Sequence, residues 1–336
     1  MASDEAAKLK NASDRTTPGA NPGVVAMLRP YTGLLALVAL CTLFGLSRPA
    51  FLSTANFFNI LNGVAIIGIL AVGQAFPLLG GGFDLSQGAV AGLCGAVTGS
   101  LLSRHGLPIP AAVAGGLAVG LLLGCVNGLL VARVGINPFV ATLGTQISFQ
   151  GLTNVYSNNQ PFSLGPYSDQ VRRFANSQDT PLTYAAILFL LLIPLLWFLL
   201  RMTPFGQHLY TLGGNEEATR LAGVNTTRLK IATYVLSGFF AALGGMVVIA
   251  RAGQASPTAG QGYELESIAS CIVGGIALGG GVGSAWNVLL GALTLAVIGN
   301  GLQMIGDVVS PNWQLVIRGG IILLAVTVDA RARLRR

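Results

Sequence analysis

Two acidic residues stand inside long apolar stretches of this chain. Asp84 lies in GGGFDLSQG (80–88) and is the only charged residue of positions 49–103. Glu264 lies in GQGYELES (261–268), where glycine, an aromatic residue, an acid and leucine recur in the same order. Ionisable side chains within apolar segments are costly and often mark a substrate or ion pathway. Helix capping at a membrane boundary is the alternative, because the preceding glycines suit a helix break.

The composition indicates a membrane protein. Charged residues make up 9% of the 336 positions and hydrophobic residues 52%, and the mean hydropathy is +0.68. Soluble domains carry about 25% charged residues. The net charge of +7 comes from basic residues near the ends of apolar segments, which favours a lipid bilayer over nucleic acid as the partner. His105 and His208 lie far apart, so we expect neither a metal site nor a catalytic triad.

Charged and glycine-rich positions divide the chain into ten candidate membrane spans. Each span needs about 20 apolar residues to cross the hydrocarbon. We expect the spans within 30–47, 57–79, 85–103, 105–132, 138–155, 180–200, 231–250, two parts of 267–306 separated by LGGGVGS (278–284), and 308–328, which contains Arg318. The predicted fold class is therefore an all-α polytopic membrane protein.

The distribution of basic residues predicts the orientation, with both termini in the cytoplasm. Thirteen basic residues then lie inside, namely Lys8, Lys10, Arg15, Arg29, Arg133, Arg201, Arg220, Arg228, Lys230, Arg331, Arg333, Arg335 and Arg336. Five lie outside, namely Arg48, Arg104, Arg172, Arg173 and Arg251. This bias follows the positive-inside rule. We expect a disordered cytoplasmic tail (1–29), a membrane domain (30–330) with a periplasmic loop (156–179) and a cytoplasmic loop (201–229), and a basic cytoplasmic tail (331–336).

Two matches in the same order predict an internal repeat. Aligning Asp84 with Glu264 also pairs Gly82 with Gly262, Phe83 with Tyr263, Leu85 with Leu265 and Gly95 with Gly275. Downstream, Asn127-Gly128-Leu129 matches Asn300-Gly301-Leu302, and a proline (Pro138, Pro311) follows each asparagine by eleven positions. The offsets of 180 and 173 predict a four-helix repeat formed by spans 2–5 and 7–10. Five crossings separate the two acids, so the halves would be inverted, as in many transporters.

The cytoplasmic loop contains a candidate short helix. Asn215 suits the N-cap, Glu216 and Glu217 suit the positive first turn, and Gly223 suits the C-terminal end. From these residues alone, an ordinary connector on the membrane face remains the alternative.

Glu217-Ala218-Thr219 followed by Gly223 resembles the EAA loop of binding-protein-dependent ABC importer permeases. The wider chain, from about residue 31 to residue 330, resembles the ribose-type sugar permeases. These belong to the superfamily of monosaccharide and branched-chain amino-acid permeases. The matching stretches are GGFDLSQGA (81–89), INPFVATLG (136–144), LGGNEEATRLAGVN (212–225), PTAGQGYELESIASCIVGGIALGGGVGS (257–284), NGLQMIG (300–306) and IILLAVTVD (321–329). The family usually reads GGIDLSVGS at the first stretch, so Phe83 and Gln87 depart from it.

The resemblance implies a permease subunit of an ATP-driven importer for a monosaccharide or related polyol. Its implied partners are a second permease copy in a homodimer, a cytoplasmic ATP-binding subunit and a periplasmic sugar-binding protein, in a bacterial inner membrane. The inner-loop helix would be the coupling helix that docks on the ATPase, with the residues Asn215, Glu216, Glu217, Ala218, Arg220 and Gly223. The outer loop 156–179 would receive the binding protein.

The chain carries no phosphate-binding loop of its own. Its lysines are Lys8, Lys10 and Lys230, and none ends a Gly-x-x-x-x-Gly-Lys-Ser/Thr motif. We therefore expect no enzyme activity and no cofactor on this chain, with ATP and Mg²⁺ held by the partner ATPase. The alternative is a self-contained transporter coupled to protons or sodium, in which Asp84 and Glu264 would bind the ion.

A pathway for a neutral sugar needs hydrogen-bonding groups of modest affinity. The candidate pathway residues are Gln74, Asp84, Ser86, Asn127, Asn137, Thr142, Glu264 and Asn300. For each amide, a hydrogen bond between helices is the alternative interpretation.

Overall fold

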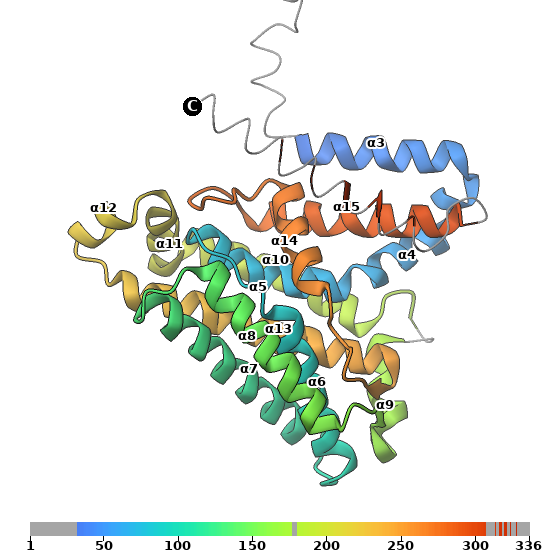
Figure 1. Cartoon of the computed structure of the whole chain (residues 1–336). Coiled ribbons are helices and arrows are strands. Elements are labelled where there is room, and N and C mark those ends of the chain that lie inside the picture. The colour runs from blue at the N-terminus through green and yellow to red at the C-terminus, as the bar shows by residue number, and fades with distance from the viewer. Residues whose placement is uncertain are drawn as a thin grey trace, which may run out of the picture.

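The computed structural model describes residues 32–176 and 180–306, together with positions 313, 316, 317, 319, 320, 323 and 327, which are helical. Helices dominate the described chain (Figure 1). The larger ones are α3 (Thr32–Ser47), α4 (Thr54–Gly63), α5 (Ala65–Leu79), α6 (Gln87–Ser103), α7 (Ile109–Ala132), α8 (Pro138–Ser157), α10 (Tyr184–Met202), α13 (Thr226–Ala252), α14 (Tyr263–Gly274) and α15 (Ala285–Met304).

Short elements connect these helices. They are η2 (Pro49–Leu52), β1 (Phe162–Ser163), η3 (Gly165–Tyr167), α9 (Ser168–Ala175), α11 (Pro204–Gly214), α12 (Glu216–Leu221) and β2 (Gln254–Ala255). The two strands pair antiparallel, with Phe162 opposite Ala255. This pairing ties the connection after α8 to the connection after α13.

Several helices are suited to cross a bilayer by length and composition. Among the described residues these are α7, α10, α13 and α15, and α4 with α5 makes a fifth if the bent pair counts as one span. The chain is thus a helical membrane protein. The predicted tenth span, with Arg318 and Pro311, lies mostly outside the described residues, and the count of ten stays a prediction.

Two predicted spans differ from the structure in their details. The span expected at 57–79 is two helices, bent by 43° where α4 ends at Gly63 and α5 begins at Ala65. The first part of the 267–306 run is α14, which begins earlier, at Tyr263, and has only 12 residues. At 1.5 Å per residue that helix is about 18 Å long, shorter than the hydrocarbon core. The expected glycine-rich break does separate α14 from α15.

The core of the bundle is α13, which packs against α7, α5 and α6. Glycines bring α13 and α7 into backbone contact: a Cβ at Gly120 would overlap the carbonyl oxygen of Gly238, and one at Gly124 the carbonyl oxygen of Tyr234. Small residues at membrane helix interfaces allow such close approach. On the side of α5, the rings of Phe76 and Phe240 stack with centroids 6.0 Å apart.

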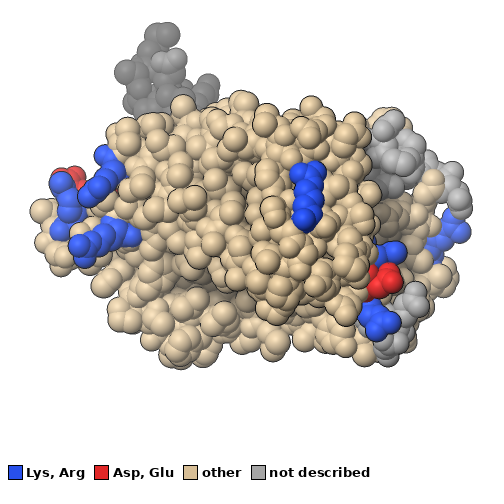
Figure 2. All heavy atoms as spheres, turned by 90° about the horizontal axis from the view of Figure 1, so that it is seen from below, with Lys and Arg blue, Asp and Glu red and all other residues tan. Residues whose placement is uncertain are grey.

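The connections with most of the charge lie at opposite ends of the molecule. In Figure 1, α11 and α12 lie at the left end of the bundle and α9 at the right end. On the face drawn in Figure 2, acidic and basic side chains gather toward two ends, and the surface between them is almost entirely uncharged. This arrangement is expected of a bundle whose middle faces lipid.

Candidate functional site: a buried polar cluster and a polar pocket

Asp84 is held by the segment that joins α5 to α6. Its Oδ1 accepts hydrogen bonds from the backbone N–H (2.9 Å) and the hydroxyl (2.6 Å) of Ser86. Its Oδ2 accepts one from the Ser237 hydroxyl on α13 at 2.7 Å. The side chain is fully buried, with 0% exposed. Asp84 thus organises the turn before α6 and also joins α13.

Gln87 extends this network across the bundle. Its Nε2 donates to the Ser237 hydroxyl at 2.9 Å, and its Oε1 accepts from the Ser267 hydroxyl of α14, also at 2.9 Å. With its amide turned so that the nitrogen faces the Asp84 carbonyl and Gln87 Oε1, Gln74 donates to each at 3.1 Å, and its oxygen accepts from the Asp84 N–H at 3.0 Å. These bonds connect α5, α6, α13 and α14.

Asn127 completes the network on the other side. Its Nδ2 donates to the Ser86 hydroxyl at 2.7 Å, and its Oδ1 accepts from the Thr145 hydroxyl of α8 at 2.7 Å. We call the connected set the polar cluster: Gln74, Asp84, Ser86, Gln87, Asn127, Thr145, Ser237 and Ser267. Its members come from α5, α6, α7, α8, α13 and α14 and from the α5–α6 connection.

The geometry of the polar cluster suits a structural tie. No salt bridge to Asp84 occurs within the described residues, so three donors compensate its loss of hydration. Charge-assisted hydrogen bonds of this kind are about twice as strong as neutral ones. Because the donors come from the chain itself, the carboxylate has little capacity left for a cargo in this conformation.

Glu264 occupies a separate place. It lies in the first turn of α14 and is 5% exposed. Its Oε1 accepts from Gln146 Nε2 of α8 at 2.9 Å. Within the described chain its Oε2 has no hydrogen-bond partner, and it packs over Gly88, where an added Cβ would overlap it. Glu264 therefore ties α14 to α8 and approaches the start of α6.

The two acids are not in contact through their carboxylates, but their helices are joined. Gln87 and Ser267, which hydrogen-bond to each other, are 180 positions apart. That is also the offset between Asp84 and Glu264. Two positions that are aligned by the predicted repeat therefore touch in the structure.

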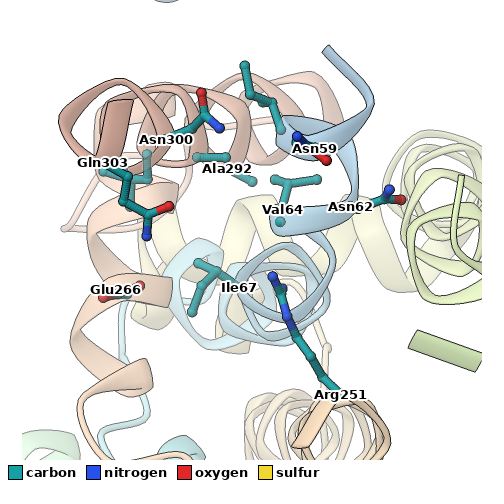
Figure 3. A pocket seen from close by; sticks show the side chains of 14 residues that line it. Asn59, Asn62, Val64, Ile67, Arg251, Glu266, Ala292, Asn300 and Gln303 are labelled. Atoms are coloured by element: carbon teal, nitrogen blue, oxygen red, sulfur yellow. The ribbon is translucent and has the colours of Figure 1, made fainter. Parts of the chain in front are cut away.

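A polar pocket of about 420 Å³ lies at the bend between α4 and α5. Its polar walls come from α4, α13, α14 and α15: Asn59, Asn62, Arg251, Glu266, Asn300 and Gln303. Figure 3 shows Arg251 reaching from α13 toward Ile67, with Gln303 and Glu266 on the other side of the gap. Ile60, Val64 and Leu295 supply apolar walls. The volume lies in the range of small-molecule sites, about 300–1,000 Å³.

The remaining predicted pathway residues have different surroundings. Asn300 lines the pocket and exchanges two 2.9 Å hydrogen bonds with Asn56 of α4. Thr142 is buried and donates to the Pro138 carbonyl at 2.7 Å within α8. Asn137 is exposed and caps α8 by accepting from the Phe139 N–H. The structure thus joins the side chains of Gln74, Asp84, Ser86 and Asn127 in one network. Of the other four residues, Thr142 meets this network only through its carbonyl, which accepts from the Thr145 hydroxyl at 3.1 Å.

The candidate coupling segment forms a short exposed helix. Asn215 caps α12 by accepting from the Ala218 N–H at 2.9 Å, as the sequence predicts. Gly223 follows the helix with φ +86°, a left-handed conformation that favours glycine. Lys230 of α13 forms an ion pair with Glu216 (N···O 2.6 Å), whereas Arg220 and Glu217 are 3.8 Å apart on the surface. The ion pair attaches α12 to the end of α13.

The described residues contain no cluster of three or more His, Cys, Asp and Glu side chains that could hold a metal ion. The four cysteines are free thiols, with Cys94 and Cys271 buried.

Comparison with known proteins places the chain among permeases. The family model described as "Branched-chain amino acid transport system / permease component" matches residues 56–326. The chain belongs to this permease family. It is 38% identical to the ribose import permease protein RbsC of Escherichia coli (strain K12), over 94% of this chain and 98% of the relative.

Two further relatives are similar over most of their length. The fructose import permease protein FrcC of Rhizobium meliloti is 37% identical over 94% of this chain and 86% of its own. The galactose/methyl galactoside import permease protein MglC of Haemophilus influenzae is 36% identical over 84% and 88%. No solved structure matches the chain.

Sequence reasoning missed several members of these sites. Gln87, Thr145, Ser237 and Ser267 of the polar cluster were not among the candidates, and neither were the pocket residues Asn59, Arg251 and Gln303. One available signal was the alignment itself, since the 180-residue offset pairs Gln87 with Ser267. Otherwise, serine and threonine residues in membrane helices do not by themselves indicate a polar site, because many of their hydroxyl groups hydrogen-bond only to their own helix.

Proposed function

We propose that this chain is the membrane subunit of an ATP-driven importer for a monosaccharide or related polyol. One observation carries the proposal: relatives named as ribose, fructose and galactose import permeases match nearly the whole chain at 36–38% identity. The family match over residues 56–326 includes the polar cluster, the pocket and the α11–α12 segment. The cargo would be received from a periplasmic binding protein and moved by alternating access.

The proposed assembly contains a second permease copy, a cytoplasmic ATP-binding subunit and the sugar-binding protein, in a bacterial inner membrane with both termini cytoplasmic. Catalysis belongs to the ATP-binding subunit, because the sequence of this chain has no Gly-Lys-Ser/Thr phosphate loop. Because α9 and α12 lie at opposite ends of the bundle (Figure 1), two different partners could bind one at each end. The binding protein would dock at the α9 end and the ATPase at the α12 end.

Reconstitution tests the energy source. The permease is reconstituted in liposomes together with its ATP-binding subunit. The periplasmic binding protein and labelled ribose, fructose or galactose are then added on the side of the membrane where the binding protein would dock. We expect uptake of at least one sugar that requires ATP and binding protein together. Uptake driven by a proton or sodium gradient in permease-only liposomes would establish the alternative, a secondary transporter.

We further propose that α12 is the coupling helix. Its support is a capped helix at the exposed end of the α11–α12 segment, attached to α13 by the Lys230–Glu216 ion pair. Gly223→Asp should abolish uptake while the complex still assembles, because it adds strain and negative charge beside the docking helix.

Gly135→Asp is the matched control for this variant. Gly135 is also exposed, has φ +80°, and leaves an added Cβ without neighbours, as does Gly223. It lies in the connection from α7 to α8, predicted on the same membrane side. Normal uptake with Gly223→Asp, or equal losses in the two variants, would exclude the specific coupling role.

We also propose that the polar pocket holds the sugar during passage. Donors and acceptors from Asn59, Arg251 and Gln303 beside apolar walls suit a polyhydroxylated molecule that binds with modest affinity. The helix bend at Gly63 supports this, since transporter sites commonly form at broken helices. The polar cluster would hold the surrounding helices in place.

The double variant Asn59→Leu with Gln303→Leu tests the pocket. We expect sugar uptake at saturating binding protein to fall several-fold while ATP hydrolysis continues. Thr42→Val is the control, because it removes a polar group on the exposed face of α3 that does not line the pocket. Unchanged maximal uptake in the double variant would contradict the pocket's role.

A further inference from the structure

Three glycine-containing turns meet at the backbone level beside the α11–α12 segment. They are Gly80–Gly81 after α5, Gly213 in the last turn of α11, and Gly280–Gly281 between α14 and α15. The Gly281 N–H donates to the Leu79 carbonyl at 2.9 Å. We call this meeting point the glycine junction.

Gly213 lies directly against this hydrogen bond between Gly281 and Leu79. An added Cβ on Gly213 would overlap both the Leu79 carbonyl oxygen and the Gly281 nitrogen. A Cβ on Gly280 would lie 2.7 Å from the Gly81 nitrogen and 2.9 Å from the Gly213 Cα. Because the contacts are between backbones, no flexible side chain can absorb a displacement of any one turn.

Each turn leads directly to a functional element. Gly213 comes two positions before Asn215, the cap of α12. Gly81 comes three positions before Asp84, the centre of the polar cluster. Gly281 comes three positions before Ser284, which caps α15. Residues of α15 line the pocket. Segments from both predicted halves of the repeat therefore meet the candidate coupling segment at one point.

Tyr210 makes a second connection between α11 and the same turn. Its hydroxyl donates to the Gly283 carbonyl at 2.8 Å. Burial raises the pKa of the Tyr210 phenol, and the charge of Arg201 opposes the shift only partly. The phenol thus stays protonated and able to donate at neutral pH.

We propose that Gly213 is a positioning residue that transmits the movement of α12 to the α5–α6 and α14–α15 turns, and so to the polar cluster and the pocket together. The proposal rests on the proposed coupling function of α12. A glycine that served packing alone would affect stability, whereas a transmitting glycine affects how much sugar moves for each ATP hydrolysed.

Gly213→Ala and Gly214→Ala form a matched pair for the test. The residues are adjacent at the end of α11, and a Cβ on Gly214 meets nothing within 4 Å. In the complete importer in liposomes, we expect Gly213→Ala to lower the ratio of sugar transported to ATP hydrolysed at least tenfold. Gly214→Ala should keep the wild-type ratio. A wild-type ratio in Gly213→Ala would overturn the proposal.

Tyr210→Phe keeps the test decisive if Gly213→Ala does not assemble. It removes one hydrogen bond with little change in shape, and we expect a two- to fivefold lower ratio at a normal amount of complex. An unchanged ratio in this variant, with Gly213→Ala unable to assemble, would assign the glycine junction to folding alone. Absence of ATP-dependent uptake in the wild-type importer would instead refute the proposed function itself.

Discussion

Three hydrogen-bond donors converge on the carboxylate of Asp84, from the Ser86 backbone, the Ser86 hydroxyl and the Ser237 hydroxyl. A buried carboxylate without a basic partner is stable only if its oxygens are satisfied in this way. Each hydroxyl donor is itself hydrogen-bonded by an amide, from Asn127 and from Gln87. The acid thus sets the direction of the hydroxyl and amide hydrogen bonds around it.

Asp84→Asn should therefore destabilise the protein despite its similar size. One carboxylate oxygen becomes an NH₂ group that faces a donor, and a buried donor left unsatisfied costs about 1–3 kcal/mol. We expect a lower melting temperature of the purified permease in detergent. Ser237→Ala, which removes only one donor, should have a smaller effect. Unchanged stability of Asp84→Asn with a raised KM for sugar uptake would instead indicate a cargo contact.

Glu264 differs from Asp84 in that half of its carboxylate is left without a hydrogen bond among the described residues. Gly88 makes room for that oxygen because it has no side chain. The two acids therefore differ in their roles although they align in sequence. Asp84 joins the α5–α6 connection to α13, whereas Glu264 joins α14 to α8.

At the level of helices, the contact of α7 with α13 depends on glycine. Gly124 lies against the backbone of Tyr234 and Val235, and Gly238 lies against the backbone of Gly120 and Gly124. In a bilayer such packing takes the place of the hydrophobic effect, which does not distinguish a helix neighbour from a lipid tail. The central position of α13 in the bundle follows from these close contacts.

Gly124→Ala should lower the stability of the membrane domain by about 1–3 kcal/mol, because the new methyl group would force the two helices apart. Thermal unfolding in detergent measures the change. Gly115→Ala in the same helix is the control, since its methyl group would meet only the end of the Leu101 side chain, which can move. Equal melting temperatures for the two variants would contradict the importance of backbone contact.

Across the whole molecule, the two charged connections lie at opposite ends (Figure 1). The positive-inside bias of the sequence predicts that the α12 end lies in the cytoplasm. Exposed acidic residues are available at each end, with Asp169 in α9 and Glu217 in α12.

Labelling of single cysteines in a cysteine-free background tests this orientation. Asp169→Cys should react with a membrane-impermeant maleimide when added to spheroplasts. Glu217→Cys should react only after the membrane is opened. Reaction of Glu217→Cys from outside would reverse the orientation and exclude α12 as an ATPase contact.

Local sequence features predicted the helical membrane fold, the ends of α12 and several members of the polar cluster. Low charge and long apolar runs indicated a helical membrane protein, and Asn215 and Gly223 marked the ends of α12. Asp84, Ser86, Gln74 and Asn127 stand out as candidate pathway residues because such side chains are rare in apolar runs, and the structure places them in the polar cluster. These predictions depend on hydropathy, capping and charge over a few neighbouring positions. Such properties do not require knowledge of distant contacts.

Other features depend on segments that are far apart in the chain. Ser237 and Ser267 join the polar cluster only because α13 and α14 pack beside α6. The pocket forms only where α4, α13, α14 and α15 come together. Gly213 contacts the backbone of Leu79 and Gly281, which lie in segments far from it in the sequence. A glycine or serine has the same local pattern whether it faces lipid or another backbone. The packing of the bundle determines which of these it meets, so the sites that combine several helices emerge only in three dimensions.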